Sequence, residues 1–157
     1  LVKTPSGEIF YVDDQSLGLD LCADGARVIK QDRGVFDTFP LSLITTQTIA
    51  RLGDMVGDEL DVLRFRPNIL VEADEDTPFL EDSWVGHVLT IGDMRMRVDE
   101  RDGRCVVISI DPVTAERNTE VFRTVTDERQ RCLGVYGSIV DPGRIAVDDK
   151  VRLESPE

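Results

Sequence analysis

Histidine is almost absent from this chain, whose 157 residues include only His87. An imidazole-based metal site therefore cannot be assembled, and a Ser-His-Asp triad would depend on a residue with no motif around it. The three cysteines, Cys22, Cys105 and Cys132, are widely spaced and include no Cys-x-x-Cys pair. An odd number of separated cysteines argues against a disulfide scaffold or a zinc site, and it favours a reducing, cytoplasmic compartment.

Long hydrophobic runs and basic residues are also scarce. Apolar stretches such as 41–44 and 106–110 are strand-sized, far short of the roughly 20 residues that cross a bilayer. No signal peptide is visible, although the first residue is Leu1 rather than Met, which leaves targeting open. The 18 Lys and Arg against 31 Asp and Glu give a formal net charge of −13. Because this charge repels phosphate backbones and anionic lipid, we expect neither nucleic acid nor a membrane as a partner.

The chain length suits one domain, and the apolar fraction of 41% is near that of globular proteins. One helical pattern starts within residues 42–46 and ends at about Leu52, before Gly53; another covers 120–130, with Asn118 or Thr119 as its cap. Residues 92–93 and 101–103 are expected turns. We predict a single domain over residues 1–157, mainly β with a few helices (α+β), built as a distorted β-barrel with helices outside. The expected strands cover residues 8–12, 26–30, 62–65, 68–72, 88–91, 94–98, 105–110, 134–140 and 145–153.

The segment Arg64-Phe65-Arg66-Pro67-Asn68 is the first candidate binding site. In a strand, Arg64 and Arg66 would share one face about 7 Å apart, and Pro67 would interrupt the ladder beside them. Two guanidinium groups next to the amide of Asn68 suit an oxygen-rich anion such as phosphate, which arginine binds bidentately. The alternative is that these arginines pair with some of the 31 carboxylates.

The second candidate site is Gly103-Arg104-Cys105. A thiolate is a nucleophile and a soft metal ligand, and a neighbouring cation favours the thiolate form. Cys105 lies where an expected turn meets an expected strand, so its side chain could lie at the mouth of a pocket. The alternative is a buried structural cysteine, which is how we interpret Cys22 and Cys132. Tyr136 could supply a hydroxyl or a stacking face, although tyrosine in a strand more often serves packing.

Taken in order, several segments resemble the MOSC family, a module named after the C-terminal part of molybdenum cofactor sulfurase. The combination of Phe-Arg-Pro-Asn with Arg-Cys about forty residues later, and then Asp-Pro-x-Thr, is specific. The similarity extends roughly from Gly34 to Leu153, with Ala115 standing where the family has glycine. The matching segments are Phe36-Asp37-Thr38 with Pro40, Arg64-Phe65-Arg66-Pro67-Asn68, Glu81-Asp82-Ser83-Trp84, Ile91-Gly92-Asp93, Arg104-Cys105, Asp111-Pro112-Val113-Thr114, Gly134 with Tyr136, Pro142-Gly143 and Ile145.

This resemblance implies a β-barrel similar to the small barrel domain of pyruvate kinase, and a molybdenum cofactor (Mo-pyranopterin). By similarity to the mitochondrial amidoxime-reducing proteins, Cys105 would ligate molybdenum and act as the catalytic residue. Arg66 and Asn68 would help to hold the pterin phosphate, with Arg64 beside them in the arginine cluster. The remaining cofactor-lining positions implied by the resemblance are Thr38, Gly103, Arg104 and Tyr136.

The leading hypothesis is a redox protein that removes oxygen from N-hydroxylated small-molecule substrates at molybdenum. An electron-donor protein would supply the electrons, because the chain has no nucleotide or iron–sulfur motif. A second hypothesis is sulfur transfer, in which Cys105 carries a persulfide that a cysteine desulfurase partner provides. The third is a non-catalytic barrel that binds a ligand or partner and keeps Cys105 buried.

Overall fold

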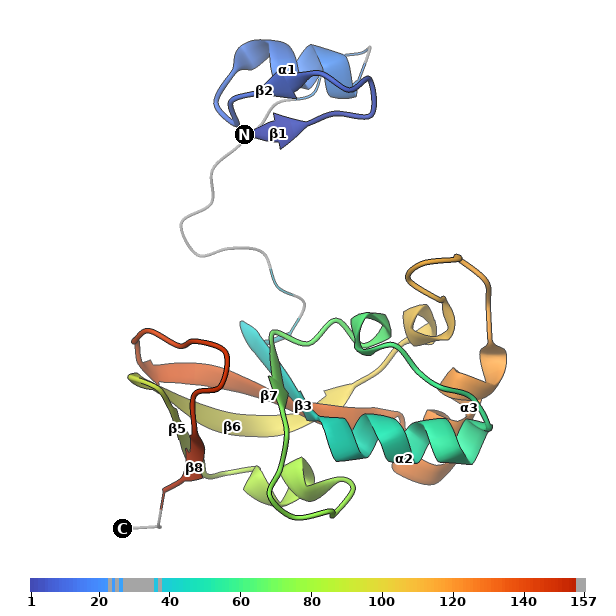
Figure 1. Ribbon diagram of the computed structural model, residues 1–157, viewed down its shortest axis with the longest axis vertical. Coiled ribbons are helices and arrows are strands. Elements are labelled where there is room, and N and C mark those ends of the chain that lie inside the picture. Colours follow the sequence, from blue (N-terminus) through green and yellow to red (C-terminus); the bar gives the residue numbers. More distant parts are fainter. Residues whose placement is uncertain (23, 25, 27–35, 37, 155–157) are drawn as a thin grey trace. The chain divides into compact units, whose positions relative to one another are not determined.

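A computed structural model describes residues 1–22, 24, 26, 36 and 38–154, and the chain divides into two compact units, residues 1–35 and 36–157 (Figure 1). In the first unit the antiparallel strands β1 (Val2–Lys3) and β2 (Ile9–Phe10) precede the short helix α1 (Gln15–Leu21). The strand expected over 8–12 is therefore shorter than predicted, and the one expected over 26–30 lies almost wholly outside the described residues. One domain over residues 1–157 stays a prediction.

In the second unit, six strands form one curled sheet, a half-barrel with the order β4-β3-β7-β6-β5-β8 (Figure 1). Strands β3 and β4 are parallel, because helix α2 crosses between them, and the other neighbouring pairs are antiparallel. The predicted β-rich fold with a few helices is confirmed. The strands are β3 (Leu41–Thr45), β4 (Ile69–Val71), β5 (Val88–Ile91), β6 (Met94–Gly103), β7 (Cys132–Asp141) and β8 (Val151–Leu153).

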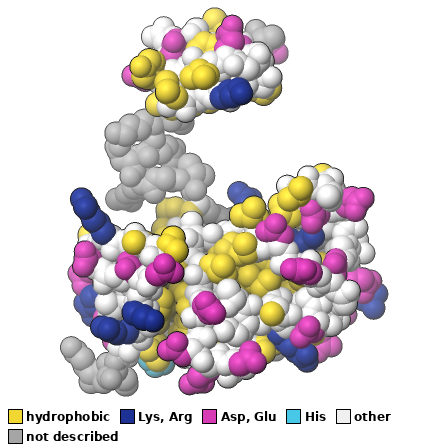
Figure 2. Space-filling model, in the orientation of Figure 1, with side chains coloured by type: hydrophobic (Ala, Val, Ile, Leu, Met, Phe, Trp, Pro, Cys, Tyr) yellow, Lys and Arg dark blue, Asp and Glu magenta, His cyan; other side chains and the backbone are white. Residues whose placement is uncertain are grey.

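The half-barrel is open between its two edge strands, β4 and β8. A groove of about 940 Å³ lies there, and Ile69 and Val71 of β4 and Val151 and Leu153 of β8 line it. In Figure 2 hydrophobic side chains are visible in this part of the unit, while acidic side chains are spread over the rest of the same face. The groove follows from the sheet order, since each edge strand pairs on one side only.

Both faces of the sheet are covered, and neighbouring residues of β3 show how. Leu43 packs into a cluster inside the curl with Trp84, Leu89 and Met96. Ile44 points the opposite way, into a second cluster that helices α2 (Thr46–Val56) and α3 (Thr119–Arg129) cover. Because both faces are covered, the neighbouring residues Leu43 and Ile44 are both fully buried.

Both predicted helices are present, but the predicted ends agree with the structure to different extents. Asn118 caps α3 as predicted, since its Oδ1 accepts a hydrogen bond from the backbone N–H of Glu120 at 3.1 Å. The predicted end of α2 before Gly53 is wrong: the helix continues to Val56, and Gly57 at φ 71° ends it. Gly53 serves a close approach instead, because a Cβ there would lie 2.7 Å from the backbone oxygen of Asp58.

No helix in the described part of the chain combines the length and apolar character that crossing a membrane requires. The cytoplasmic location stays a prediction.

Two predicted strands are short 3-10 helices. Residues 62–65 form η1 (Val62–Arg64), which Asp61 starts by accepting the backbone N–H of Leu63 at 2.8 Å. Residues 105–110 contain η3 (Val106–Ser109), and the turn expected over 101–103 is instead the end of β6. Short apolar runs fit either structure, so their pattern did not decide between them. The hairpin of β5 and β6 is confirmed, whereas the strand expected over 145–153 is limited to β8.

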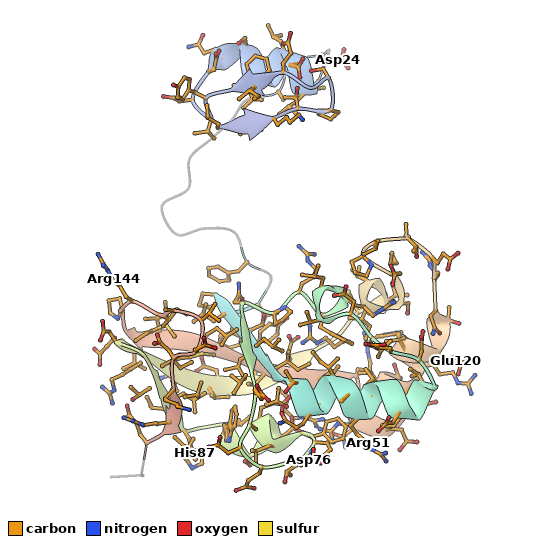
Figure 3. The ribbon with its side chains drawn as sticks, in the orientation of Figure 1. Asp24, Arg51, Asp76, His87, Glu120 and Arg144 are labelled. Atoms are coloured by element: carbon orange, nitrogen blue, oxygen red, sulfur yellow. The ribbon has the colours of Figure 1, made fainter. Side chains whose placement is uncertain are left out.

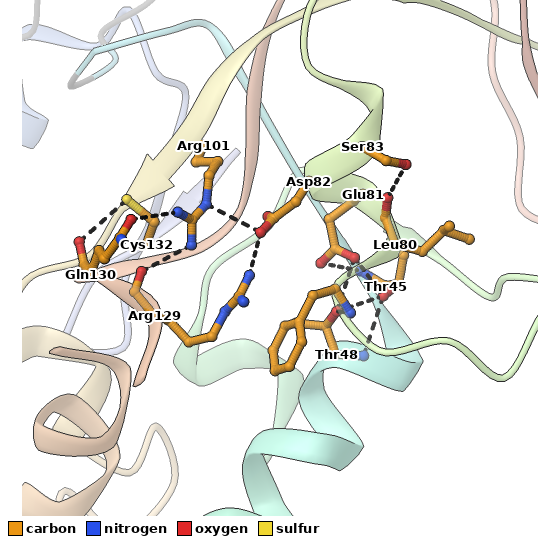
Figure 4. Close-up of polar contacts among 11 residues, drawn as sticks. Thr45, Thr48, Leu80, Glu81, Asp82, Ser83, Arg101, Arg129, Gln130 and Cys132 are labelled. Atoms are coloured by element: carbon orange, nitrogen blue, oxygen red, sulfur yellow. Dashed lines mark hydrogen bonds and ion pairs between the residues drawn. The ribbon is translucent and has the colours of Figure 1, made fainter. Parts of the chain in front are cut away.

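Glu81, in the 3-10 helix η2 (Leu80–Trp84), is a fully buried carboxylate that joins η2 to the junction of β3 and α2 (Figure 4). Its Oε2 accepts hydrogen bonds from the hydroxyls of Thr45 and Thr48, each at 2.9 Å. Its Oε1 accepts from the backbone N–H of Thr45 at 3.4 Å. Three donors on one carboxylate offset part of the cost of burying it.

The neighbouring Asp82 connects η2 to β6 and to α3 (Figure 4). Its Oδ2 pairs with Arg101 of β6 at 3.2 Å and also accepts a hydrogen bond from Arg129 of α3. The Arg129 guanidinium in turn lies over the ring of Phe79, 3.8 Å from its centre. Adjacent acidic residues of η2 thus hold α2 and α3 in place against the same sheet.

We expect Glu81→Ala to lower the free energy of unfolding of the second unit by about 2–4 kcal/mol, because it leaves buried donors of Thr45 and Thr48 without an acceptor. Urea denaturation followed by the fluorescence of Trp84, the only tryptophan, measures this change. Glu128→Ala, at an exposed position of α3, is the matched control. Equal stability of the two variants would contradict the structural role of Glu81.

Candidate functional site

The side chain of Arg104 connects three segments that the sequence separates. It follows β6 directly, and its Nε donates to the carbonyl oxygen of Leu133 at 2.8 Å, while Nη1 donates to that of Phe65 at 2.7 Å. Nη2 forms an ion pair with Asp102 at 2.8 Å. One guanidinium therefore fixes the segment before Arg66, the segment before Tyr136, and the segment that carries Cys105 relative to one another.

Arg104 is buried, and so is its partner Asp102, with side-chain exposures of 8% and 2%. Burial lowers the pKa of the Arg104 guanidinium below its ordinary value, while Asp102 foremost, and then Tyr136, Cys105 and Cys132, act in the opposite direction. Asp102 is thus the group that most favours the charged form of the guanidinium. A buried guanidinium whose donors face protein oxygens is structural in this arrangement.

Arg64 and Arg66 do not share a strand face, so that part of the prediction is wrong. Arg64 ends η1 and is buried: its Nη1 donates to the carbonyl oxygen of Ile108 at 3.3 Å, and its Nη2 pairs with Asp111 at 2.9 Å. The alternative interpretation, an arginine paired with a carboxylate, therefore holds for Arg64. The helical turn of η1 is the physical reason, because it turns consecutive side chains away from the two-residue alternation of a strand.

The Asp-Pro-x-Thr motif has a structural role in this arrangement. Besides pairing with Arg64, Asp111 accepts the backbone N–H groups of Val113 at 2.9 Å and Thr114 at 2.8 Å through its Oδ1. These backbone hydrogen bonds, and then the charge of Arg64, hold the pKa of Asp111 below its ordinary value. Asp111 thus links the turn after η3 to η1, and both elements lie next to the candidate site residues in the chain.

Arg66 differs from Arg64 in its exposure, its pairing and its backbone conformation. It is exposed, and the described part of the chain offers its guanidinium no hydrogen bond or ion pair. Its backbone is in the left-handed region at φ 51°, an unusual conformation for arginine, and its N–H donates to the carbonyl oxygen of Leu63 at 3.2 Å. Backbone strain of this kind occurs often at ligand-binding positions.

Asn68 and Tyr136 are brought together by Ser42 of β3. The Oδ1 of Asn68 accepts the backbone N–H of Ser42 at 2.9 Å, and the N–H of Asn68 donates to the carbonyl oxygen of Ser42 at 3.0 Å. Ser42 is also the direct cross-strand partner of Tyr136 on β7. Sequence analysis missed Ser42, because nothing in its local pattern indicates a contact with Asn68, 26 residues away.

Thr38 joins this group through its neighbour Phe39. The rings of Phe39 and Tyr136 are 5.8 Å apart between centres, so the segment that contains the exposed Thr38 lies beside β7. Gly134, two residues before Tyr136, has φ 76°, and a Cβ there would lie 2.7 Å from the carbonyl oxygen of Leu43 and 3.3 Å from Nη2 of Arg104. Only glycine allows β7 to pass this close to β3 and to Arg104.

Cys105 is exposed and carries a free thiol, immediately before η3. The hypothesis of a buried structural cysteine at this position is therefore wrong. Gly103 is exposed on the same side of the chain, and a Cβ on it would meet nothing within 4 Å. Open space thus lies beside Cys105, as a site for a sizeable ligand requires.

Within the described residues, no group of three or more His, Cys, Asp or Glu could hold a metal ion. The single histidine, His87, lies between η2 and β5 (Figure 3).

Arg104→Lys should lower the free energy of unfolding by about 2–4 kcal/mol. The single ammonium group of lysine cannot replace the guanidinium, whose nitrogens contact Phe65, Leu133 and Asp102 at the same time. Chemical denaturation measures the change. Arg97→Lys in β6 is the control, since Arg97 is exposed and, within the described residues, forms an ion pair with Asp99 alone. If both substitutions cost the same, Arg104 does not hold the three segments together.

Comparison with known proteins identifies several relatives of this chain. The model of the MOSC domain family matches residues 30–152. Molybdenum cofactor sulfurase of Danio rerio is 42% identical over 77 residues, which are 48% of this chain and 9% of the sulfurase. Mitochondrial amidoxime-reducing component 1 of Danio rerio is 30% identical over 124 residues, which are 73% of this chain and 37% of that protein. The chain thus spans well under half of the length of these relatives.

The crystal structure of YiiM from Geobacillus stearothermophilus shares the fold. Its TM-score is 0.54 at 12% identity, and the match covers 73% of this chain and 54% of that one. The family model covers most of the chain, including each position singled out above from Thr38 to Tyr136. The chain belongs to the MOSC domain family.

Proposed function

We propose that this protein binds a molybdenum cofactor with the thiolate of Cys105 as the protein ligand of the metal. The observation that carries the proposal is the exposed, free thiol of Cys105, which lies beside the open space at Gly103. The hydrogen bonds of the neighbouring Arg104 hold this segment in place. A thiolate is a soft ligand that suits molybdenum, and its exposure gives the metal access without unfolding.

Arg66 and Asn68 fit the anionic end of such a cofactor. The guanidinium of Arg66 is exposed without a partner in the described residues, and the amide oxygen of Asn68 is held by Ser42, which leaves its NH₂ group as the donor. Two donors that lie two residues apart in the same segment suit a phosphate group. They also offset its charge locally in a protein whose net charge is −13.

The other predicted positions divide into two groups. Thr38, Gly103 and Tyr136 would line the bound cofactor: the segment of Thr38 lies beside β7, which carries Tyr136, and Gly103 lies at the end of β6. Arg64 and Arg104 would act indirectly, because their buried guanidinium groups hold the backbone of the segments that carry Arg66 and Cys105. We assign these two arginines as positioning residues.

The cofactor would supply two-electron oxygen-atom transfer, and we propose reduction of N-hydroxylated small molecules as the reaction. The similarity to the amidoxime-reducing component supports this choice, although the chain spans 37% of that relative. Electrons would come from a donor protein. The residues of this chain would bind, orient and shield the reacting group.

Sulfur transfer is the second candidate function, favoured by the similarity to molybdenum cofactor sulfurase and by the same accessible thiol. In that case a cysteine desulfurase would load Cys105 with a persulfide. The non-catalytic hypothesis loses its main support, because it requires a buried Cys105.

In a host that makes molybdenum cofactor, the purified protein should contain molybdenum and pterin, and Cys105→Ala should lose most of the metal because its only protein ligand is gone. Metal analysis and the fluorescence of the released, oxidised pterin measure this. Cys22→Ala is the matched control, since Cys22 is an exposed thiol of the first unit. Absence of molybdenum from the parent chain would refute the proposal, and a persulfide on Cys105 would then support sulfur transfer.

Arg66→Ala should reduce cofactor affinity by roughly ten- to a hundredfold, as expected for about 1.5–3 kcal/mol lost with a charged hydrogen bond. Folding should be unchanged, because the guanidinium is exposed and unpaired in the described residues. The measurement is pterin occupancy at limiting cofactor, with thermal unfolding alongside. Arg51→Ala on the exposed face of α2 should retain full occupancy; an equal loss in both variants would show that only net charge matters.

A further inference from the structure

We infer that Cys132 is the resolving thiol of Cys105, so that a peroxide oxidises the pair to an intramolecular disulfide. The inference does not depend on molybdenum binding, and it gives Cys132 a role beyond the structural one that its sequence context suggests.

The strand register places Cys132 beside the segment that carries Cys105. Gly103, the last residue of β6, is the direct partner of Cys132, the first residue of β7. The backbone N–H of Arg104 donates to the carbonyl oxygen of Arg131 at 2.7 Å, one residue beyond this pair on each strand. That pattern identifies Gly103 and Cys132 as a non-hydrogen-bonded pair, in which Cα atoms approach to about 4.5 Å and side chains share one face.

Cys105 lies on the same face as Cys132. Exposure alternates over three residues, with Gly103 exposed, Arg104 buried and Cys105 exposed. Cys105 has extended backbone angles, φ −114° and ψ 177°. Arg104 points to the interior, where it meets the carbonyl oxygen of Leu133, so Cys105 points outward.

Gly103 places no side chain next to the two thiols: it is the cross-strand partner of Cys132, it precedes Cys105 by two residues, and even a methyl group there would meet no atom within 4 Å. The guanidinium of Arg104 beneath this face interacts electrostatically with both Cys105 and Cys132. Two partly or fully exposed thiols therefore face one open space over one buried cation.

A modest movement is needed to join them. A diagonal neighbour two residues along the strand lies about 8 Å away between Cα atoms, from about 4.5 Å across and about 6.6 Å along. Disulfides span roughly 4.4–6.8 Å between Cα atoms, so the gap must close by about 1–4 Å. Cys105 lies outside the ladder, and as the residue before η3 it makes no side-chain cap hydrogen bond. Its segment can therefore move while β6 and β7 stay paired.

The chemistry balances with a hydroperoxide as the oxidant. The Cys105 thiolate attacks the peroxide, the O–O bond breaks, and a sulfenic acid and hydroxide form. The Cys132 thiolate then attacks the sulfenic sulfur, a sulfur–sulfur bond forms, and the sulfenic oxygen leaves as water once protonated. Two electrons pass from the two thiols to the peroxide. The disulfide protects Cys105 from irreversible oxidation until a cellular thiol reduces it.

Trypsin separates the three cysteines, because cleavage yields residues 4–27, 105–117 and 132–144 as distinct peptides. The full-length chain is reduced, freed of reductant, treated with hydrogen peroxide, alkylated, digested and analysed by mass spectrometry without reduction. We expect the 105–117 and 132–144 peptides to appear as one linked species. Added thiol should separate them.

Two variants make the result decisive. In Cys132→Ser the linked species should be lost, and dimedone should trap several-fold more sulfenic acid on Cys105, with sulfinic acid accumulating later. In Cys22→Ser the link between Cys105 and Cys132 should persist. Oxidation of Cys105 that proceeds equally in the parent and in Cys132→Ser, or linkage mainly through Cys22, would overturn the inference. Neither result bears on whether the reduced thiol binds molybdenum.

Discussion

The candidate site depends on one buried cation. The guanidinium of Arg104 has lost most of its hydration, and Asp102 and the carbonyl oxygens of Phe65 and Leu133 offset part of that loss. Each of these partners belongs to a different stretch of backbone. Removal of any one partner would leave charge or donors unsatisfied, so the three stretches of backbone keep a fixed spacing. The same contacts therefore fix how far apart the backbones of the exposed Arg66 and Cys105 lie.

The parts of the fold that the sequence predicts are those with strong local signals. The hairpin of β5 and β6 has a Gly-Asp turn between alternating strands, and α3 has a capping asparagine before an apolar stripe. Residues 62–65 and 105–110 lack such signals, because short, mainly apolar segments fit a strand or a 3-10 helix equally. Tertiary contacts decide there, and they are invisible to a local pattern.

The same limit applies to the site. Arg64 and Arg66 are alike in sequence, yet one is buried against Asp111 and the other is exposed, because the deciding partner lies 47 residues away. The family resemblance identified the segments but did not indicate which arginine is buried and which is exposed. Ala115, where the family has glycine, adopts φ 60°, which costs an alanine roughly 1–2 kcal/mol. Its N–H donates to the carbonyl oxygen of Asp111 at 3.0 Å, so the turn keeps its glycine-type conformation without the glycine.

The hydrogen bonds of Arg104 span 29 and 39 residues of chain, and the Arg64–Asp111 pair spans 47. Contacts of such sequence separation require the closure of large loops, which proceeds more slowly than the formation of a hairpin or a helix. We therefore expect the contacts that position Cys105 to form after the β5–β6 hairpin and α3. A ligand that bridges these stretches would then slow unfolding, because it stabilises contacts that form late.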